Sequence, residues 1–164
     1  MNRWLIAFCA WLEQTPPSEV IQSAGWIVPT VQTIHILSVA LVMTSVLMIA
    51  LRLFGILWRD QPFERVTARF LPLIWWPLLV LLLTGIVMIV GEPARALRNP
   101  IFQLKMALLL AALVATFVFL RLLRNPASAE PAAQPRAAPR VVAGISLLLW
   151  VGIVFAGRWI AYWA

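Results

Sequence analysis

The sequence predicts an all-α membrane protein, a four-transmembrane-helix bundle with an N-terminal interfacial amphipathic helix. Of its 164 residues, 63% are hydrophobic and only 12% are charged, whereas a soluble domain carries about 25% charged residues. Four apolar segments each reach the roughly 20 residues that a membrane-spanning helix needs. The segments between them are too short to form a separate soluble domain, so we expect one transmembrane domain.

Residues 1–14 form the predicted interfacial helix, because their large apolar side chains recur at helical spacing. The stripe consists of Trp4, Leu5, Phe8, Trp11 and Leu12. We expect this helix to be retained in the mature protein, since Glu13 and Gln14 make a poor cleavage site for a signal peptide. After two prolines, Ser18 is expected to cap a helix that continues into the first span.

Four spans follow, separated by polar or proline-rich connections. They cover about residues 26–53, 70–90, 101–123 and 141–160. Between the last two spans, residues 125–140 are rich in alanine and proline and predict a flexible linker. The single cysteine, Cys9, excludes an internal disulfide, and we expect it to be a small apolar filler.

The basic residues predict the orientation of the spans. Eight lie in or beside the two connections after spans 1 and 3: Arg52, Arg59, Arg65, Arg69, Arg121, Arg124, Arg136 and Arg140. The opposite side has five: Arg3, Arg95, Arg98, Lys105 and Arg158. The positive-inside rule therefore predicts a multi-pass protein of the bacterial inner membrane with both termini in the periplasm. This bias also explains the net charge of +7, so the expected partner is the lipid bilayer and not nucleic acid.

The few polar side chains within the spans gather toward the predicted outer face. At about 1.5 Å per residue, His35 lies about 13 Å inside the first span and Thr84 about 9 Å from the outer end of the second. We expect both to share an interior region with Gln32 and Gln103. The third span carries a small-residue stripe, which we expect to pack against the other spans, with a similar notch on the fourth. The stripe is Gln103, Ala107, Ala111 and Ala115, and the notch is Gly152 and Ala156.

His35 is the only histidine, and an ionisable residue inside a membrane is a functional candidate. One interpretation makes it an axial ligand of a b-type haem or a hydrogen-bond donor to a quinone. Met106 or His35 of a second copy would then be the sixth ligand of a haem, and Trp150 would stack on the planar cofactor. In the other interpretation, His35 is neutral and bonded to Gln32, to Ser38 or to a backbone carbonyl. Apart from haem iron, no metal is expected.

Lys105 is the one lysine, and we expect it to face lipid or a groove. Its position in the third span is about two thirds of a turn from the small-residue stripe. A lysine there can reach the outer headgroups with its ammonium group while its stem stays in the hydrocarbon, near Glu92. A proton relay is the alternative interpretation.

Several short motifs resemble those of a known family. They are Trp11-Leu12-Glu13, Trp26-Ile27-Val28-Pro29, the run from Ile34 to Leu41, Leu51-Arg52-Leu53-Phe54-Gly55, and Phe102-Gln103-Leu104-Lys105-Met106-Ala107-Leu108-Leu109. Over roughly residues 11–120 the chain resembles an uncharacterised bacterial family of small four-helix inner-membrane proteins, a domain of unknown function. The resemblance implies the fold and the compartment. The His35 segment is also similar to copper-resistance and cytochrome b561-like membrane proteins, which implies haem.

The sequence contains no phosphate-binding glycine loop, no Gly-x-Ser-x-Gly elbow, no His-Glu-x-x-His motif and no acidic residue within a span. These absences favour a non-enzymatic protein. We therefore predict a membrane subunit or scaffold that packs against itself, as a homo-oligomer, or against a partner in a larger membrane complex. The alternative is a redox module that binds haem b or a quinone near His35.

Overall fold

The computed structural model describes residues 3–124 and 137–162, and in these residues all regular structure is helical. Four helices are long and apolar enough to cross a membrane. They are α3 (Ile27–Leu53), α5 (Pro72–Gly91), which continues the shorter α4 (Phe63–Phe70), α7 (Pro100–Arg124) and α8 (Ala137–Trp159). These helices confirm the predicted all-α fold class and indicate a multi-pass membrane protein.

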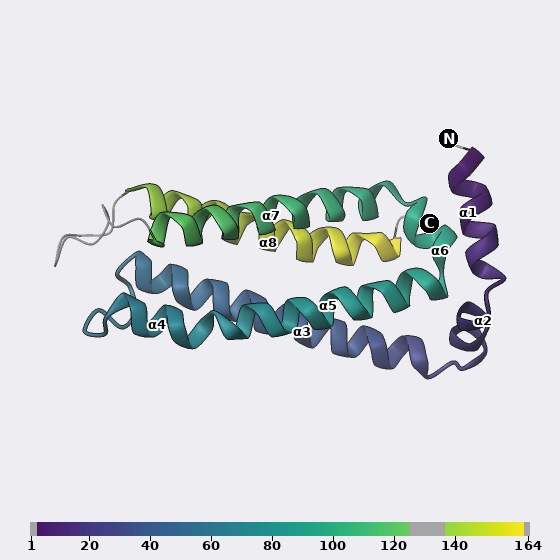
Figure 1. The fold of residues 1–164 in the computed structure, drawn as a ribbon, viewed down its shortest axis with the longest axis horizontal. Helices are drawn as coiled ribbons and strands as arrows, with labels where there is room; N and C mark the ends of the chain where they lie inside the picture. The colour runs from purple at the N-terminus through teal and green to yellow at the C-terminus, as the bar shows by residue number, and fades with distance from the viewer. Residues whose placement is uncertain (1–2, 125–136, 163–164) are drawn as a thin grey trace.

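The four long helices form two antiparallel pairs, α3 with α5 and α7 with α8 (Figure 1). The pairs are joined mainly through α3 and α8, whereas α5 and α7 have no comparable contact. One end of the bundle is covered by α1 (Arg3–Glu13), α2 (Pro16–Ser23) and α6 (Pro93–Leu97). We call it the terminal end, and we call the opposite end, which carries α4 and residues 54–62, the loop end.

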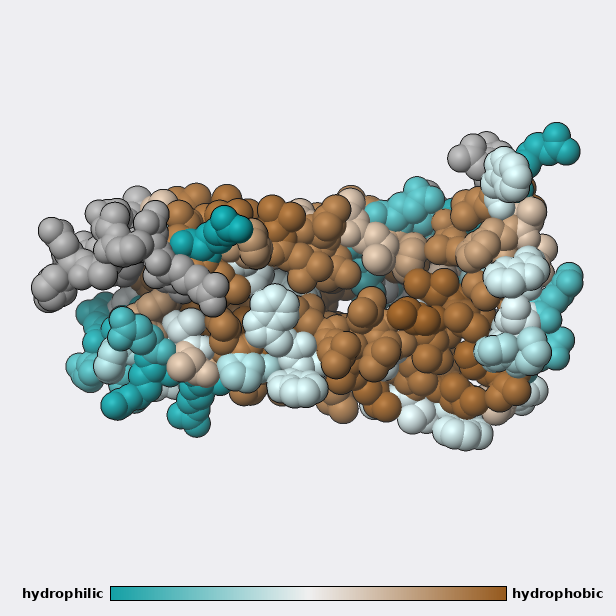
Figure 2. Space-filling model, in the orientation of Figure 1, coloured by the Kyte–Doolittle hydropathy of each residue, from teal (hydrophilic) through white to brown (hydrophobic). Residues whose placement is uncertain are grey.

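The surface has the polarity expected for a bilayer. Figure 2 shows a broad hydrophobic band over the middle of the bundle, with hydrophilic residues concentrated toward the two ends. Large apolar side chains such as Leu148, which is 73% exposed, stay on this surface because lipid is as apolar as the side chains themselves. The buried core is correspondingly small, and most of it lies in the half toward the loop end. Its members include Val46, Ile49, Leu53, Ala143 and Trp150.

The two N-terminal helices lie across the terminal end (Figure 1). Helix α1 contacts α6, and its buried Cys9 is the apolar filler that the sequence predicts. Helix α2 caps the end of α5, because the hydroxyl of Ser18 donates to the carbonyl of Val90 at 2.8 Å and the amide of Gln22 to that of Gly91 at 3.1 Å. The last carbonyls of a helix have no partner within it, so these bonds fix α2 on the bundle.

Three details differ from the sequence-based expectations. Ser18 lies inside α2 and is not an N-cap, because the prolines start α2 earlier and the chain turns again before α3. Within the predicted linker 125–140, residues 125–136 lie outside the described part, and residues 137–140 already form the first turn of α8. The small-residue stripe of α7 is not packed inside the bundle, since Ala107 and Ala111 are exposed.

The face of α7 that does pack is rotated by one residue from the predicted stripe. Leu108 lies over Gly152 of α8, where its Cδ1 atom is 3.4 Å from the position a Cβ would take. Ala112, one turn further, is completely buried. The glycine notch of α8 therefore receives Leu108 of α7, because filling a notch gains more van der Waals contact than pairing two flat stripes.

Candidate functional site

His35 on α3 is held by Thr84 on the neighbouring helix α5, with 2.8 Å between Nδ1 and Oγ1. We assign the proton of the Thr84 hydroxyl to the carbonyl of Val80, which lies at 2.7 Å from Oγ1. With this assignment, the Thr84 oxygen accepts from Nδ1–H of the imidazole. In the neutral ring, Nε2 then presents a lone pair, and among the described residues it has no hydrogen-bond partner.

A glycine makes room for this imidazole. A Cβ on Gly85, next to Thr84, would lie 3.9 Å from Cε1 of His35. The ring is half-buried, while Ser38, one turn deeper on α3, bonds to the carbonyl of its own helix residue Ile34 at 2.8 Å. Of the partners expected for a structural histidine, the structure therefore uses neither Gln32 nor Ser38.

Lys105 reaches the same region from the second helix pair. The lysine is half-buried, and its Nζ lies 3.6 Å from the position that a Cβ on Gly157 of α8 would take. The side chain thus crosses α8 where that helix has no side chain of its own. The sequence predicted that Lys105 faces lipid or a groove, and the structure places it over a glycine of α8. Glu92, the expected neighbour, pairs with Arg95 at 3.0 Å instead.

The helix register places these groups at one level. Helices α3 and α8 are antiparallel, and Arg140 donates to the carbonyl of Leu53 at 3.3 Å near the loop end. His35 lies 18 residues before Leu53, and Arg158 lies 18 residues after Arg140. At about 1.5 Å per residue both are about 27 Å from that contact. His35 is therefore level with Gly157, against which Lys105 rests.

We call this level the polar layer. It comprises His35 of α3, Thr84 and Gly85 of α5, Lys105 of α7 and Gly157 of α8. All four long helices contribute to it, so the layer depends on the complete bundle. It contains one imidazole, one hydroxyl and one ammonium group but no carboxylate.

Apolar side chains close the polar layer on the side of the loop end. Val42 on α3 and Trp150 on α8, each two turns deeper than the layer on its own helix, are 0% and 1% exposed. Trp150 packs in the hydrophobic core, as the more frequent use of such a residue would predict. Its indole Nε1 is buried with no hydrogen-bond partner among the described residues.

The other candidate residues lie away from the polar layer. Gln32 and Gln103 are exposed, and the amide of Gln103 donates to the carbonyl of Leu97 at 3.3 Å. Met106 is 45% exposed, on the residue after Lys105 and thus about 100° around the helix. The structure brings His35 and Thr84 together and adds Lys105. The glycines at 85 and 157 were the sequence signal that could have revealed this, since each leaves room for a polar side chain.

The polar layer is suited to binding. No group of three or more His, Cys, Asp or Glu side chains occurs in the described part of the chain, so the layer offers a single metal ligand at most. Its one hydroxyl, on Thr84, donates to Val80 and accepts from His35 in the assignment given above, so the imidazole does not act as its base. What it does offer is an acceptor on His35 and a donor on Lys105, on opposite helix pairs.

Comparison with known proteins is consistent with the sequence-based expectation of an uncharacterised family. Residues 8–163 match the profile of a family of unknown function, DUF6644. No curated protein and no solved structure matches the chain. The match covers nearly the whole chain, including α8, which the recognised motifs did not reach. The chain therefore belongs to the DUF6644 family of unknown function.

Proposed function

We propose that this protein is a non-enzymatic subunit of the bacterial inner membrane that associates with a second copy of itself through α7. One observation carries the proposal: the small-residue stripe of α7 faces outward. Ala107 and Ala111 are exposed, and Ala115 is half-buried. Exposed small residues spaced by four allow another helix to approach closely, which is the usual basis of helix association in lipid.

The position of α7 in the bundle supports the same proposal. Among the four spanning helices, α7 is the least buried. Its main partner is α8, with a minor contact to the short α6. A helix with one neighbour leaves most of its surface for others, and its exposed stripe is the part where backbone contact would be closest.

The proposed orientation places the loop end in the cytoplasm. Arg52, Arg65, Arg69 and Arg140 all belong to this end, and the positive-inside rule assigns such clusters to the cytoplasmic side. The terminal end, with α1, α2 and the polar layer, would then face the periplasm. The aromatic side chains of Trp4 and Trp11 on α1 are exposed there and suit the membrane interface.

Disulfide cross-linking in native membranes tests the association. Because Cys9 is the only cysteine, a Cys9→Ser background gives one thiol per chain for each introduced cysteine. We expect Ala111→Cys to form a covalent dimer on mild oxidation. Leu148→Cys is the matched control, since Leu148 is 73% exposed on α8, away from the stripe. Equal dimer formation at both positions, or none at Ala111, would contradict the proposal.

A second candidate function is a redox module that holds haem b or a quinone at His35. The observation that favours it is the fixed imidazole, because a ligating histidine usually donates its other ring N–H to a neighbour. Nδ1 donates to Thr84 and Nε2 stays open. The residues present supply one axial ligand only, because Met106 is exposed and lies away from the polar layer, about 100° around α7 from Lys105. The sixth ligand would have to come from a second copy.

An absorption spectrum of protein purified from haem-replete cells, with and without dithionite, tests the haem. A Soret band that is lost in His35→Ala is the expected result, and its absence from the wild-type protein would exclude haem. Quinone is tested by lipid extraction and mass spectrometry of the same two proteins. Equal quinone in both would exclude a site at His35.

A further inference from the structure

Lys105 is a half-buried cation that lies against α8, and among the described residues it has no counter-ion. The one ion pair between described residues joins Glu92 to Arg95, whose side chains are both exposed. None of the four spanning segments contains an acidic residue. A charge near hydrocarbon is costly unless it is paired or reaches water. The stem of Lys105 nevertheless leads its Nζ to Gly157 of α8.

His35 presents the complementary group at the same level. Thr84 fixes the ring so that Nε2 carries the free lone pair, and this nitrogen has no partner among the described residues. Lys105 offers three N–H donors and His35 one acceptor. A group that satisfies both needs one oxygen that accepts and a second that carries or shares a proton. Carboxyl and phosphate groups have this pair of oxygens.

We propose that the polar layer binds the acid group of an amphiphilic molecule, a carboxyl or phosphate on an apolar tail. One oxygen accepts a charge-assisted hydrogen bond from Lys105 Nζ, and another gives its proton to Nε2 of His35. The ionised acid is then the missing counter-ion of Lys105. Thr84 is a positioning residue, because it contacts the ligand only through the orientation of the imidazole. This site does not depend on the self-association through α7.

The depth of the polar layer suits the headgroup of such a molecule. His35 lies eight residues inside α3 and Lys105 five residues inside α7, which corresponds to about 12 and 8 Å along the helix axes. The acid group would thus lie close to the boundary between hydrocarbon and headgroups. The tail would extend deeper into the bundle, toward the loop end.

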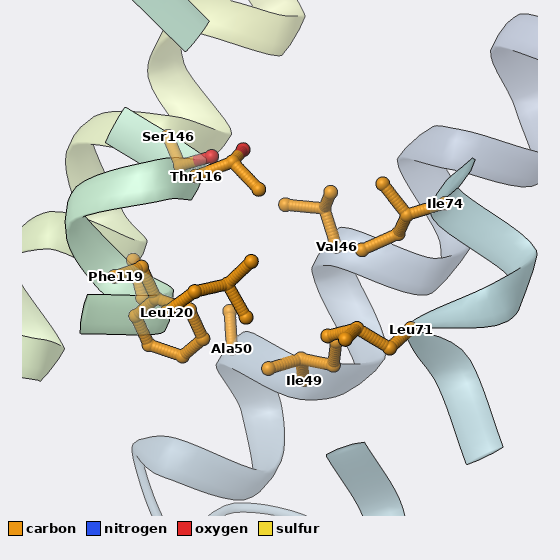
Figure 3. Close-up of a pocket in the computed structure, with 10 residues that line it drawn as sticks. Val46, Ile49, Ala50, Leu71, Ile74, Thr116, Phe119, Leu120 and Ser146 are labelled. Atoms are coloured by element: carbon orange, nitrogen blue, oxygen red, sulfur yellow. The ribbon is translucent and has the colours of Figure 1, made fainter. Parts of the chain in front are cut away.

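An apolar pocket lies in that direction, on the seam between the two helix pairs. It is partly open and has a cavity volume of about 40 Å³, which is enough for the end of a tail only. Figure 3 shows Val46, Leu71 and Ile74 of the first pair facing Thr116 and Phe119 of the second across this space. Val42 and Trp150 fill the space below the polar layer. Because α5 and α7 have no comparable contact, we infer that the tail passes beside these two side chains, along the seam between α5 and α7.

Binding of oleate to the purified, delipidated protein in a neutral detergent tests the proposal. Methyl oleate has the same tail without the acid, and dioleoylphosphatidic acid replaces the carboxyl by a phosphate. Affinity is read from the rise of the melting temperature with ligand concentration. We expect oleate or phosphatidic acid, or both, to stabilise the protein and methyl oleate to do so much less. The acid that binds more tightly identifies the headgroup class.

Two variants locate the site. Lys105→Met keeps the apolar stem and removes the charge, so loss of a charge-assisted hydrogen bond should weaken acid binding by about tenfold or more. Arg158→Met is the matched control, because Arg158 is exposed at the same level and bonds to Tyr162. The affinity of Arg158→Met for the acid should stay near that of the wild type.

Three results would overturn the proposal. They are equal stabilisation by oleate and methyl oleate, the absence of stabilisation by any acid, and equal weakening in both variants. The first comparison needs only the wild-type protein, so it remains decisive if Lys105→Met does not fold. Loss of dimer cross-linking at Ala111→Cys would leave all three comparisons unaffected, which separates this proposal from the one on self-association.

Discussion

Replacing Thr84 by valine should break the polar layer with the smallest change in shape. Valine has the same size but cannot accept from Nδ1 of His35, which is 2.8 Å away in the wild type. Hydrogen bonds between membrane helices contribute on average about 0.6 and at most about 1.7 kcal/mol in double-mutant cycles. Because His35 is half-buried and its ring N–H would lose its one partner, we expect the contribution of this hydrogen bond to lie toward the upper end of that range.

The assay is unfolding by dodecyl sulfate in mixed micelles, with a cycle of Thr84→Val, His35→Leu and the double variant. The coupling free energy should be about 1 to 1.7 kcal/mol. Thr116→Val is the matched control, because the hydroxyl of Thr116 bonds only to the carbonyl of Ala112 on its own helix, at 2.9 Å. Additive effects of the first two changes, or an equal loss in the control, would refute the bond between α3 and α5.

Two further predictions concern the core and the terminal end. Trp150→Ala should lower the free energy of unfolding by about 3–5 kcal/mol. Trp150→Phe should lower it much less, because this change removes the indole N–H that has no partner. Similar losses in the two variants would contradict this. Gly91→Val should displace α2, since a Cβ there would lie 2.8 Å from Cγ2 of Ile21. The α1 helix should follow, so that Cys9, 3% exposed in the wild type, reacts faster with maleimide; an unchanged rate would show that α2 tolerates the side chain.

The fold class was predictable from the sequence because the bilayer imposes simple rules. Four apolar segments of sufficient length leave a helical bundle as the solution, since backbone groups in lipid must be bonded within each segment. The sequence does not determine which helices pair. Contact between α3 and α8, and its absence between α5 and α7, depends on side-chain fit along whole helices.

The candidate site was predictable in part. Depth along each helix follows from counting residues, so His35 and Thr84 were expected in one region, and the structure places them in contact. The rotation of a helix about its axis is harder to predict, because 100° separates consecutive residues. Small residues suggested that Ala107 faces the bundle and that Lys105 faces lipid or a groove. Ala107 is instead exposed and Lys105 lies over Gly157 of α8, which only three-dimensional packing reveals.

The most direct test of the polar layer is nitrogen NMR of the imidazole. His35 is the only histidine, so protein labelled with ¹⁵N-histidine gives one pair of ring signals without assignment. In the neutral ring, the bond to Thr84 predicts a protonated Nδ1 and an unprotonated Nε2, and Thr84→Val should remove this preference. A wild-type spectrum with the proton on Nε2 and a bare Nδ1 would contradict the orientation of His35, and with it the binding site built on that orientation.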